Sequence, residues 1–385
     1  MSVSSRLQPF GVTIFAEMTA LAQAHDAINL GQGFPDWDGP DFVKQAAAES
    51  MRKGGSDQYP PMPGIPPLRQ AIADRYSAKL GREIDPDTEV TVTCGCTEGL
   101  FASLVGLVDP GDEVVIINPY YDSYPVGVAM AGAVPRHVVL RPPDFRLDVD
   151  ELAAAFSDRT KAILLNTPHN PSGRVFDRAE MEAVADLCIE HDVIAICDEV
   201  YEEITFGPEH IRLATLPGME ERTVTLSSVG KTYSLTGWKV GWAIAPHHLT
   251  AGVRATHQYM TFTTPTPVQH GAVAALEAPE TFYDELRESY RAKRDLLADG
   301  LTSVGFDVRI PDGTYFMLAG YSRFSGEDDR AFARRLVEQV GVAVIPPSVF
   351  YDDPADGHSL IRFAFCKQTP VLEAAVERLS RLSPN

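Results

Sequence analysis

The chain has 385 residues, of which 44% are apolar and 22% charged, as in an ordinary globular protein of about two domains. Its formal net charge of -20 argues against nucleic acid or an anionic membrane as a partner, since both would repel it. No stretch approaches about 18 consecutive apolar residues, so no membrane-spanning helix is predicted.

The first residues, MSVSSRLQPF, contain neither the apolar segment nor the cleavage pattern of a secretory signal. The five cysteines are odd in number, and Cys188 and Cys197 lie inside apolar segments, as free thiols in a reducing compartment do. We therefore expect a cytoplasmic protein. Cys94 and Cys96 form a C-x-C pair, but no second pair of ligands follows nearby, so no metal site is predicted.

The N-terminal part of the chain predicts helices separated by loops rich in glycine and proline. Helices are expected over residues 11–24, over residues 41–53, and from Pro66 or Pro67 to about residue 80. The loop 31–40 allows its backbone to approach a ligand closely. It is not the dinucleotide-binding motif G-x-G-x-x-G, because Asp36 stands at the third glycine position.

The middle of the chain repeats one pattern five times: a short apolar run ends abruptly in a polar or glycine-rich turn. These runs cover residues 90–93, 114–117, 162–165, 193–197 and 224–226. Helical patterns lie between most of them, for example over residues 98–108 and 178–191. This alternation predicts an α/β fold with a mostly parallel sheet covered by helices. Ligands bind beyond the carboxyl ends of such strands, so the five turns are predicted to meet at one crevice.

After Trp242 the pattern changes to helices that alternate with short strands. Helices are expected over residues 249–260, 267–278, 281–303, 329–340 and 371–382, and strands over residues 306–310, 315–319, 342–345 and 360–365. This part predicts a smaller α+β domain. We expect residues 41–280 to form the large domain and residues 281–385 the small one, with the N-terminal segment 1–40 belonging to the small domain.

Lys231 directly follows the last apolar run, in the stretch SSVGKTYSLTGWKVG. A lysine desolvated at a strand end has a lowered pKa and can form a Schiff base. The alternative is a lysine whose amine reaches the edge of the crevice for structural reasons. VGKT also resembles the end of a P-loop, but Thr225 stands where that motif needs glycine, so a nucleotide triphosphate site is not predicted.

Asp198 follows the strand IAIC and is predicted to lie at the bottom of the crevice. A buried carboxylate needs a cation. That cation is either a lysine or arginine in a structural ion pair, or the protonated ring nitrogen of pyridoxal phosphate, which then acts as an electron sink. Asn170 and Tyr201 are candidates to contact the phenolic oxygen of that ring, although asparagine before proline is also a common turn former.

DEVY, N-x-P-H-N-P-x-G, S-x-x-K with G-W-K-x-G, and IRFAF together resemble the class I and II (fold type I) pyridoxal-phosphate aminotransferases. LGQGFPD, QYPP and NPYYDSYP are similar to the branch with kynurenine aminotransferases, glutamine transaminase K, methionine-type and N-succinyldiaminopimelate aminotransferases. The resemblance covers nearly the whole chain. It implies pyridoxal 5'-phosphate as cofactor, a homodimer with shared active sites, and ping-pong transfer from an L-amino acid to a 2-oxo acid such as 2-oxoglutarate.

The resemblance also implies roles for the matching residues around the ring. Lys231 is the Schiff-base lysine and the base that moves the substrate proton. Asp198 pairs with the pyridine nitrogen, and Asn170 and Tyr201 contact the phenolic oxygen. Tyr121 stacks on the ring face, with ordinary core packing as the alternative.

The phosphate and the substrate are assigned in the same way. The residues implied for the phosphate are Gly95, Cys96, Thr97, Ser228, Lys239 and, from the other subunit, Tyr59. The residues implied for the substrate are Arg362 and the backbone of Gly33 at the α-carboxylate, Asn170, and Phe262 at the side chain. For Phe262 the alternative is packing between subunits.

The sequence departs from this branch at two positions. Cys96 stands where the phosphate turn usually has a different small residue, and its thiol is open to oxidation. Thr263 stands where kynurenine-type members have a histidine, so strict kynurenine specificity is not expected. Aromatic residues predict a roomy apolar pocket for methionine, glutamine or aromatic donors: Tyr121, Tyr124, Tyr259 and Phe262. An N-succinyl-LL-diaminopimelate type of donor would need further cations near the entrance.

Two other functions remain open from the sequence. A cysteine-S-conjugate β-lyase would use the same residues and expel a β-leaving group. A non-catalytic regulator would need an appended DNA-binding segment, and the N-terminus offers neither a helix-turn-helix pattern nor a basic patch.

Overall fold

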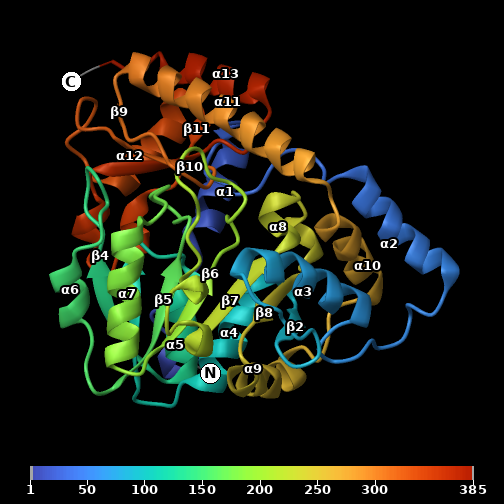
Figure 1. Ribbon diagram of the computed structural model, residues 1–385. Coiled ribbons are helices and arrows are strands. Elements are labelled where there is room, and N and C mark those ends of the chain that lie inside the picture. The colour runs from blue at the N-terminus through green and yellow to red at the C-terminus, as the bar shows by residue number, and fades with distance from the viewer. Residues whose placement is uncertain (1–2, 384–385) are drawn as a thin grey trace.

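The computed structural model describes residues 3–383 and is built around a seven-stranded sheet with the strand order β2-β8-β7-β6-β5-β3-β4 (Figure 1). Its strands are β2 Val90–Thr93, β3 Glu113–Asn118, β4 Val134–Val139, β5 Thr160–Asn166, β6 Ile194–Asp198, β7 Thr223–Ser228 and β8 Gly241–Ile244. All are parallel except β8, which runs antiparallel between β7 and β2. The carboxyl ends of the parallel strands therefore share one edge, as the sequence predicted.

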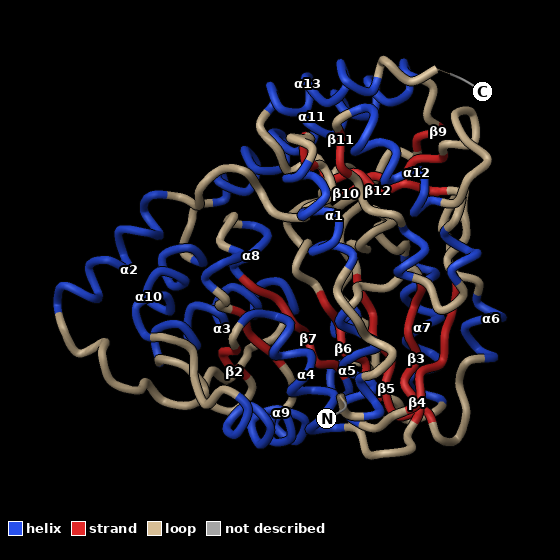
Figure 2. The backbone as a smooth tube through the Cα atoms, turned by 180° about the vertical axis from the view of Figure 1, so that it is seen from behind, coloured by secondary structure: helices blue, strands red, loops and turns tan. Residues whose placement is uncertain are grey.

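Apolar side chains alternate across the central strands, and this buries both faces of the sheet. On one face, Val114 and Ile116 of β3 pack against α4 Gly95–Leu107, α5 Ser123–Ala131 and α9 His247–Met260. On the other face, Val115 and Ile117 pack against α6 Val149–Ala154 and α7 Arg178–Glu190. Figure 1 shows α7 in front of the sheet, and the reverse view in Figure 2 shows α4 and α5 in front.

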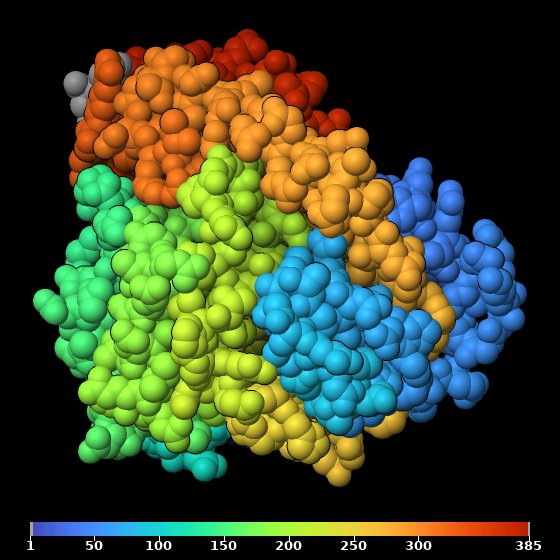
Figure 3. Space-filling model, viewed as in Figure 1, coloured from blue at the N-terminus to red at the C-terminus, as the bar shows by residue number. Residues whose placement is uncertain are grey.

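The end of the sheet formed by β2 and β8 has its own apolar core. Trp242 of β8 packs with α3 Pro66–Leu80 and α10 Thr266–Leu276, and α2 Asp41–Lys53 lies against α10. In Figure 3 the segment around α2 (blue) stands at one side of the molecule, beside the start of α11 Glu280–Val304 (orange).

The remaining elements form a smaller unit above the carboxyl edge of the large sheet (Figure 1). Strands β9 Asp307–Val308, β10 Phe316–Gly320 and β12 Leu360–Ala364 form an antiparallel sheet, and β1 Ile28–Asn29 pairs in parallel with β11 Val342–Ala343. The helices of this unit are α1 Ile14–Ala24, α11, α12 Asp329–Arg335 and α13 Thr369–Leu379. The N-terminal α1 thus packs with the C-terminal elements. The exact domain boundaries stay a prediction.

The predicted α/β fold with a mostly parallel sheet is confirmed, with local differences. The first helix begins at Ile14 and not at residue 11, because the Thr13 side chain caps it by accepting from the Ala16 N–H. The helix expected over residues 329–340 is α12 followed by a π-helical turn, Leu336–Val340. Among residues 3–383 no helix is both long and apolar enough to cross a bilayer.

Candidate active site

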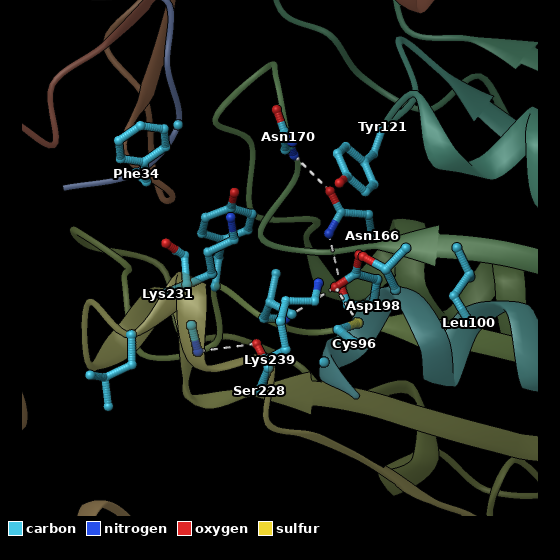
Figure 4. A pocket seen from close by; sticks show the side chains of 18 of the residues that line it. Phe34, Cys96, Leu100, Tyr121, Asn166, Asn170, Asp198, Ser228, Lys231 and Lys239 are labelled. Carbon is cyan, nitrogen blue, oxygen red and sulfur yellow. Dashed lines mark hydrogen bonds between the residues drawn. The ribbon is translucent and has the colours of Figure 1, made fainter. Parts of the chain in front are cut away.

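A cavity of about 260 Å³ lies at the carboxyl edge of the large sheet, below the smaller unit. All predicted site residues except Tyr59 and Phe262 line it: Gly33, Gly95, Cys96, Thr97, Tyr121, Asn170, Asp198, Tyr201, Ser228, Lys231, Lys239 and Arg362. Figure 4 shows part of this set around the cavity. The predicted convergence of the strand-end turns is therefore found in the structure.

The first turn of α4 presents backbone N–H groups to the cavity. The first N–H groups of a helix have no partner within it, so Cys96 and Thr97 can offer theirs to an anion. Gly95 has a left-handed φ of +79°, and a Cβ there would lie 3.1 Å from Lys239 Nζ. The amine of Lys239 therefore lies beside this turn. A Cβ at Gly241 would lie 2.5 Å from the Gly95 carbonyl carbon, so β8 approaches the turn too closely for a side chain.

Glu98 of α4 and His257 of α9 form a buried pair that contacts this turn. Glu98 accepts from the Cys94 N–H, and both its carboxylate oxygens lie 3.1 Å from Nδ1 of His257. Nε2 of His257 lies 3.1 Å from the carbonyl of Met62, so His257 also contacts the loop that carries Tyr59. The turn is thus fixed by buried polar contacts and not only by the helix.

Asp198 ends β6 at the floor of the cavity and is 8% exposed. Its Oδ2 accepts from the Tyr124 hydroxyl at 2.9 Å, and its Oδ1 accepts from the Val200 N–H at 3.3 Å and the Cys96 thiol at 3.5 Å. Among the described residues it forms no salt bridge. Burial raises the pKa of this carboxyl, while the three donors and the Lys231 charge oppose the rise. A ligand cation in the cavity would stabilise the ionised form.

Lys231 lies in the short helix α8 Val229–Thr232, directly after β7. Its Nζ lies 5.7 Å from the ring centroid of Tyr201 and 6.0 Å from that of Tyr315. Burial lowers the pKa of this amine, and the neighbouring Cys366 and Asp198 partly offset that effect. A lowered pKa makes an amine a better base and nucleophile near neutral pH, and the buried position of Lys231 in the cavity is compatible with such a role.

Arg362 enters the cavity from β12 and is 1% exposed. Its Nη1 donates to Oδ1 of Asn170 at 3.3 Å, and its Nη2 donates to the Gly31 carbonyl at 2.8 Å. Nε has no partner among the described residues. Burial lowers the pKa of the guanidinium to about 10. Because both bonded partners are neutral, the positive charge remains available for a ligand carboxylate.

The loop after β1 forms one wall of the cavity and is fixed through its carbonyl groups. Tyr315 Oη donates to the Gly33 carbonyl at 2.7 Å, and Lys367 Nζ donates to the carbonyls of Gln32 and Phe34 at 3.2 and 2.8 Å. A Cβ at Gly33 would lie 2.6 Å from Cζ of Phe316, which explains the glycine.

The predicted aromatic wall is only partly correct. Tyr121 lines the cavity, but the Tyr124 side chain is buried on Asp198 and is not part of that wall. Tyr259 is 86% exposed, outside the cavity. Tyr59 is 84% exposed and packs edge-on against Phe262, with ring centroids 5.4 Å apart. Their predicted roles depend on a second subunit.

Several lining residues were not predicted from the sequence: Phe15, Gln32, Phe34, Leu100, Asn166 and Phe316. Asn166 ends β5, donates to the Asp198 carbonyl at 2.8 Å and accepts from the Asn170 N–H at 2.7 Å. Because Asn166 is the polar residue at the end of an apolar strand, its place in the site could have been predicted from the sequence. The phenylalanines carry no such signal, because the sequence does not distinguish them from core residues.

The donors in this cavity fit pyridoxal phosphate. A buried carboxylate without a bonded cation suits a protonated ring nitrogen, and a helix N-terminus beside Ser228 and Lys239 suits a phosphate dianion. The Arg362 guanidinium, whose two bonded partners are neutral, suits a further anion.

Comparison with known proteins agrees with this chemistry. Residues 25–379 match the family described as aminotransferase class I and II. A probable N-succinyldiaminopimelate aminotransferase of Mycobacterium tuberculosis is 46% identical, and the alignment covers 98% of each chain. A methionine aminotransferase of Escherichia coli is 44% identical, also over 98% of each chain. A kynurenine–oxoglutarate transaminase of Dictyostelium discoideum is 40% identical over 98% of this chain and 96% of its own.

The fold gives the same result. The solved structure of N-succinyldiaminopimelate aminotransferase from Mycobacterium tuberculosis superposes with a TM-score of 0.96, covering 99% of this chain and 100% of that one. These relatives give no support to the β-lyase, the non-catalytic regulator or the P-loop alternatives. The chain belongs to the class I and II aminotransferases and is a pyridoxal-phosphate-dependent aminotransferase of fold type I.

Proposed function

We propose that this aminotransferase moves the amino group of an L-amino acid with an uncharged side chain, of the methionine, glutamine or aromatic type, to a 2-oxo acid such as 2-oxoglutarate. The observation that carries the proposal is Arg362, a buried cation set among aromatic rings. The rings of Phe316, Phe15 and Phe350 have centroids 4.2, 5.2 and 5.3 Å from its Cζ. Such surroundings favour a ligand with one carboxylate and an apolar remainder.

We assign the cofactor's parts to the chain's residues as follows. Lys231 would carry the covalent attachment, Asp198 would accept from the ring nitrogen, and Asn170 and Tyr201 would contact the phenolic oxygen. Tyr121 would cover the ring face. The phosphate is held by Ser228, Lys239, the backbone N–H groups of Cys96 and Thr97, and the close approach that Gly95 permits. When bound there, pyridoxal phosphate supplies an electron sink for the charge left when the substrate Cα proton departs.

The proton movements follow from the chain's own groups. The two Nη atoms of Arg362 bind the substrate carboxylate, helped by the backbone of Gly33, and so orient the Cα–H bond. The Nζ of Lys231, whose pKa burial lowers, would take the Cα proton from the substrate and return a proton later in the transfer. Since one site serves the donor and then the acceptor, ping-pong kinetics are expected.

Covalent attachment tests the central assignment. Borohydride reduction of the holoenzyme should fix the cofactor on the peptide that contains residue 231, and the Lys231→Ala variant should retain none after denaturation. Label on another lysine of the wild type would overturn the assignment.

A panel of donors tests the substrate class. Methionine, phenylalanine, kynurenine and N-succinyl-LL-diaminopimelate should be compared with 2-oxoglutarate as acceptor, by kcat/KM. The proposal expects the apolar and aromatic donors to be the better substrates. The identity to the mycobacterial protein favours the succinylated donor as a second candidate, and a higher kcat/KM with it would overturn our choice. Three cations line the cavity: Lys231, Lys239 and Arg362. Each is already assigned to the cofactor or to the substrate α-carboxylate, so none of the three is left to bind the succinyl carboxylate.

We further infer a cytoplasmic homodimer with shared sites. Exposed apolar residues lie at the end of α9 and just beyond it, Tyr259, Met260 and Phe262, and the exposed Tyr59 packs against Phe262. In this proposal Tyr59 reaches the phosphate of the other subunit, and Phe262 contacts the substrate there. Mixed dimers of Tyr59→Ala and Lys231→Ala subunits should contain one intact site and regain activity that neither parent shows. Mixtures with no gain over the parents would contradict sharing.

A further inference from the structure

Two helices approach the Asp198 carboxylate with side-chain donors. Tyr124 comes from α5 and donates to Oδ2 at 2.9 Å, and Cys96 comes from the first turn of α4 and lies 3.5 Å from Oδ1. Figure 4 shows the Cys96 sulfur beside Asp198. Because an ionised carboxylate only accepts hydrogen bonds, the thiol must be the donor. Burial raises the pKa of the Cys96 thiol well above its usual value, and the Asp198 charge adds to this, so the thiol keeps its proton.

Cys96 is placed to contact two parts of one ligand site. Its backbone N–H belongs to the turn that faces the phosphate, while its side chain points to Asp198. Cys94, two residues earlier, points elsewhere: its sulfur lies 3.8 Å from the Thr263 carbonyl and 3.5 Å from Oγ1 of Thr264. The C-x-C pair therefore contains one thiol directed at the site and one directed at a neighbouring loop.

We propose that Cys96 is a positioning residue, whose thiol holds Oδ1 of Asp198 and thereby helps to keep the proton on the cofactor's ring nitrogen. This rests on the proposed pairing of Asp198 with that nitrogen. A hydrogen bond donated to a carboxylate stabilises its ionised form. When a donor is lost, the proton shared between carboxylate and ring nitrogen moves toward the carboxylate, and the ring becomes a weaker electron sink.

The test measures that proton directly. Holoenzyme is prepared with pyridoxal phosphate labelled with 15N in the ring, and the nitrogen chemical shift is recorded for the wild type, Cys96→Ala, Cys96→Ser and Cys94→Ala. We expect Cys96→Ala to move the signal toward that of a neutral pyridine and to lower kcat by about fivefold, the effect of one net hydrogen bond. Cys96→Ser, which keeps a donor of similar size, should return the signal to the wild-type position or beyond it.

The controls separate this inference from the function it rests on. Cys94→Ala should leave the nitrogen signal unchanged, and an equal shift in both alanine variants would overturn the proposal. Asp198→Asn should move the signal furthest. If it does so while Cys96→Ala and Cys96→Ser both match the wild type, only the role of Cys96 is wrong. If Asp198→Asn itself has no effect, the pairing of Asp198 with the ring nitrogen is wrong. Should Cys96→Ala fail to fold, Cys96→Val decides instead, because valine has a similar size and no hydrogen-bond donor, and a nitrogen signal at the wild-type position in that variant would contradict the proposal.

Discussion

Asp198 and Glu202 lie four residues apart in DEVYEE, and both carboxylates are buried, but their surroundings differ completely. Glu202 is bonded to Lys79 at 2.9 Å and also to Arg212, with the Tyr76 hydroxyl as a further donor. Asp198 has only neutral donors within the described chain. Glu202 thus has its cations within the fold, whereas the carboxylate inside the cavity is left for a ligand to complete.

The pKa shifts follow the same division. Burial alone pushes the pKa of Glu202 upward, but Lys79 and Arg212 outweigh burial and leave it below its usual value. For Asp198 burial prevails and the pKa is raised. A buried carboxylate without a cation destabilises the folded apoprotein, and binding of a cationic ligand restores that stability.

The largest expected effect comes from neutralising Glu202, the carboxylate that is bonded to cations of the fold. Glu202→Gln removes the anion that Lys79 and Arg212 share and leaves each with one other carboxylate, Glu203 and Glu199 respectively, so the free energy of unfolding of the apoprotein should fall by up to about 3–5 kcal/mol. Urea unfolding measures this loss. The exposed Glu182, paired with Arg178 on the surface of α7, supplies the control, since Glu182→Gln should change stability by less than about 0.5 kcal/mol. Equal losses in the two variants would contradict the comparison.

Neutralising Asp198, the carboxylate that faces the cavity, should affect turnover and not folding. Asp198→Asn should lower kcat about 10²- to 10³-fold or more, because a buried charge partner of the cofactor is lost in the transition state. Its apoprotein should unfold at no lower urea concentration than the wild type. Near-normal turnover would show that Asp198 does not control the ring nitrogen.

The pH dependence of stability should have opposite signs at the two positions. The lowered pKa of Glu202 means that the wild type's advantage over Glu202→Gln is present above the unfolded pKa, and is lost as pH falls through the folded pKa. The raised pKa of Asp198 means that the wild-type apoprotein loses stability as pH rises through it, so Asp198→Asn should be the more stable protein near neutrality. Urea unfolding from about pH 8 down to about pH 2 distinguishes these curves, because the Glu202 contribution begins to be lost only below the ordinary pKa of 4.5, and parallel curves would refute the assignment.

The smallest effect separates two adjacent serines of β7, which point to opposite sides. Ser227 donates to Glu202 at 3.1 Å, whereas Ser228 lines the cavity. Ser227→Ala should lower the free energy of unfolding by about 0.5–1.5 kcal/mol and leave pyridoxal phosphate affinity unchanged. Ser228→Ala should weaken that affinity instead, as cofactor titration of the apoproteins measures. A loss of affinity in Ser227→Ala would show that the two sides are coupled.

The sequence predicted those parts of the fold and site that short-range patterns encode. Five apolar runs gave five strands, because continuous burial on both faces makes such runs stand out. Two strands of the large sheet were missed, for different reasons. β4 is an edge strand whose first three residues are exposed, so it shows no apolar run. β8 has only four residues and follows a turn that already carried the motif G-W-K-x-G.

The parts that could not be predicted depend on direction in space. Nothing in NPYYDSY indicates that Tyr121 faces the cavity while Tyr124 turns onto Asp198. The contact of Cys96 with Asp198 joins residues 102 positions apart, and only the fold brings them together. Tyr59 and Phe262 stay predictions because their proposed ligand contacts belong to the other subunit.

The way in which the loop of residues 31–34 is held makes it a suitable place for redesign. Arg362, Tyr315 and Lys367 all donate to its carbonyl oxygens, which every amino acid possesses. The side chains of Gln32 and Phe34 line the cavity and can be exchanged without losing these anchors. A library at these two positions, with Gly33 kept, would vary the cavity wall while its backbone stays in place. Selection for new donors can therefore begin there, in a segment whose backbone is held largely through its carbonyl groups.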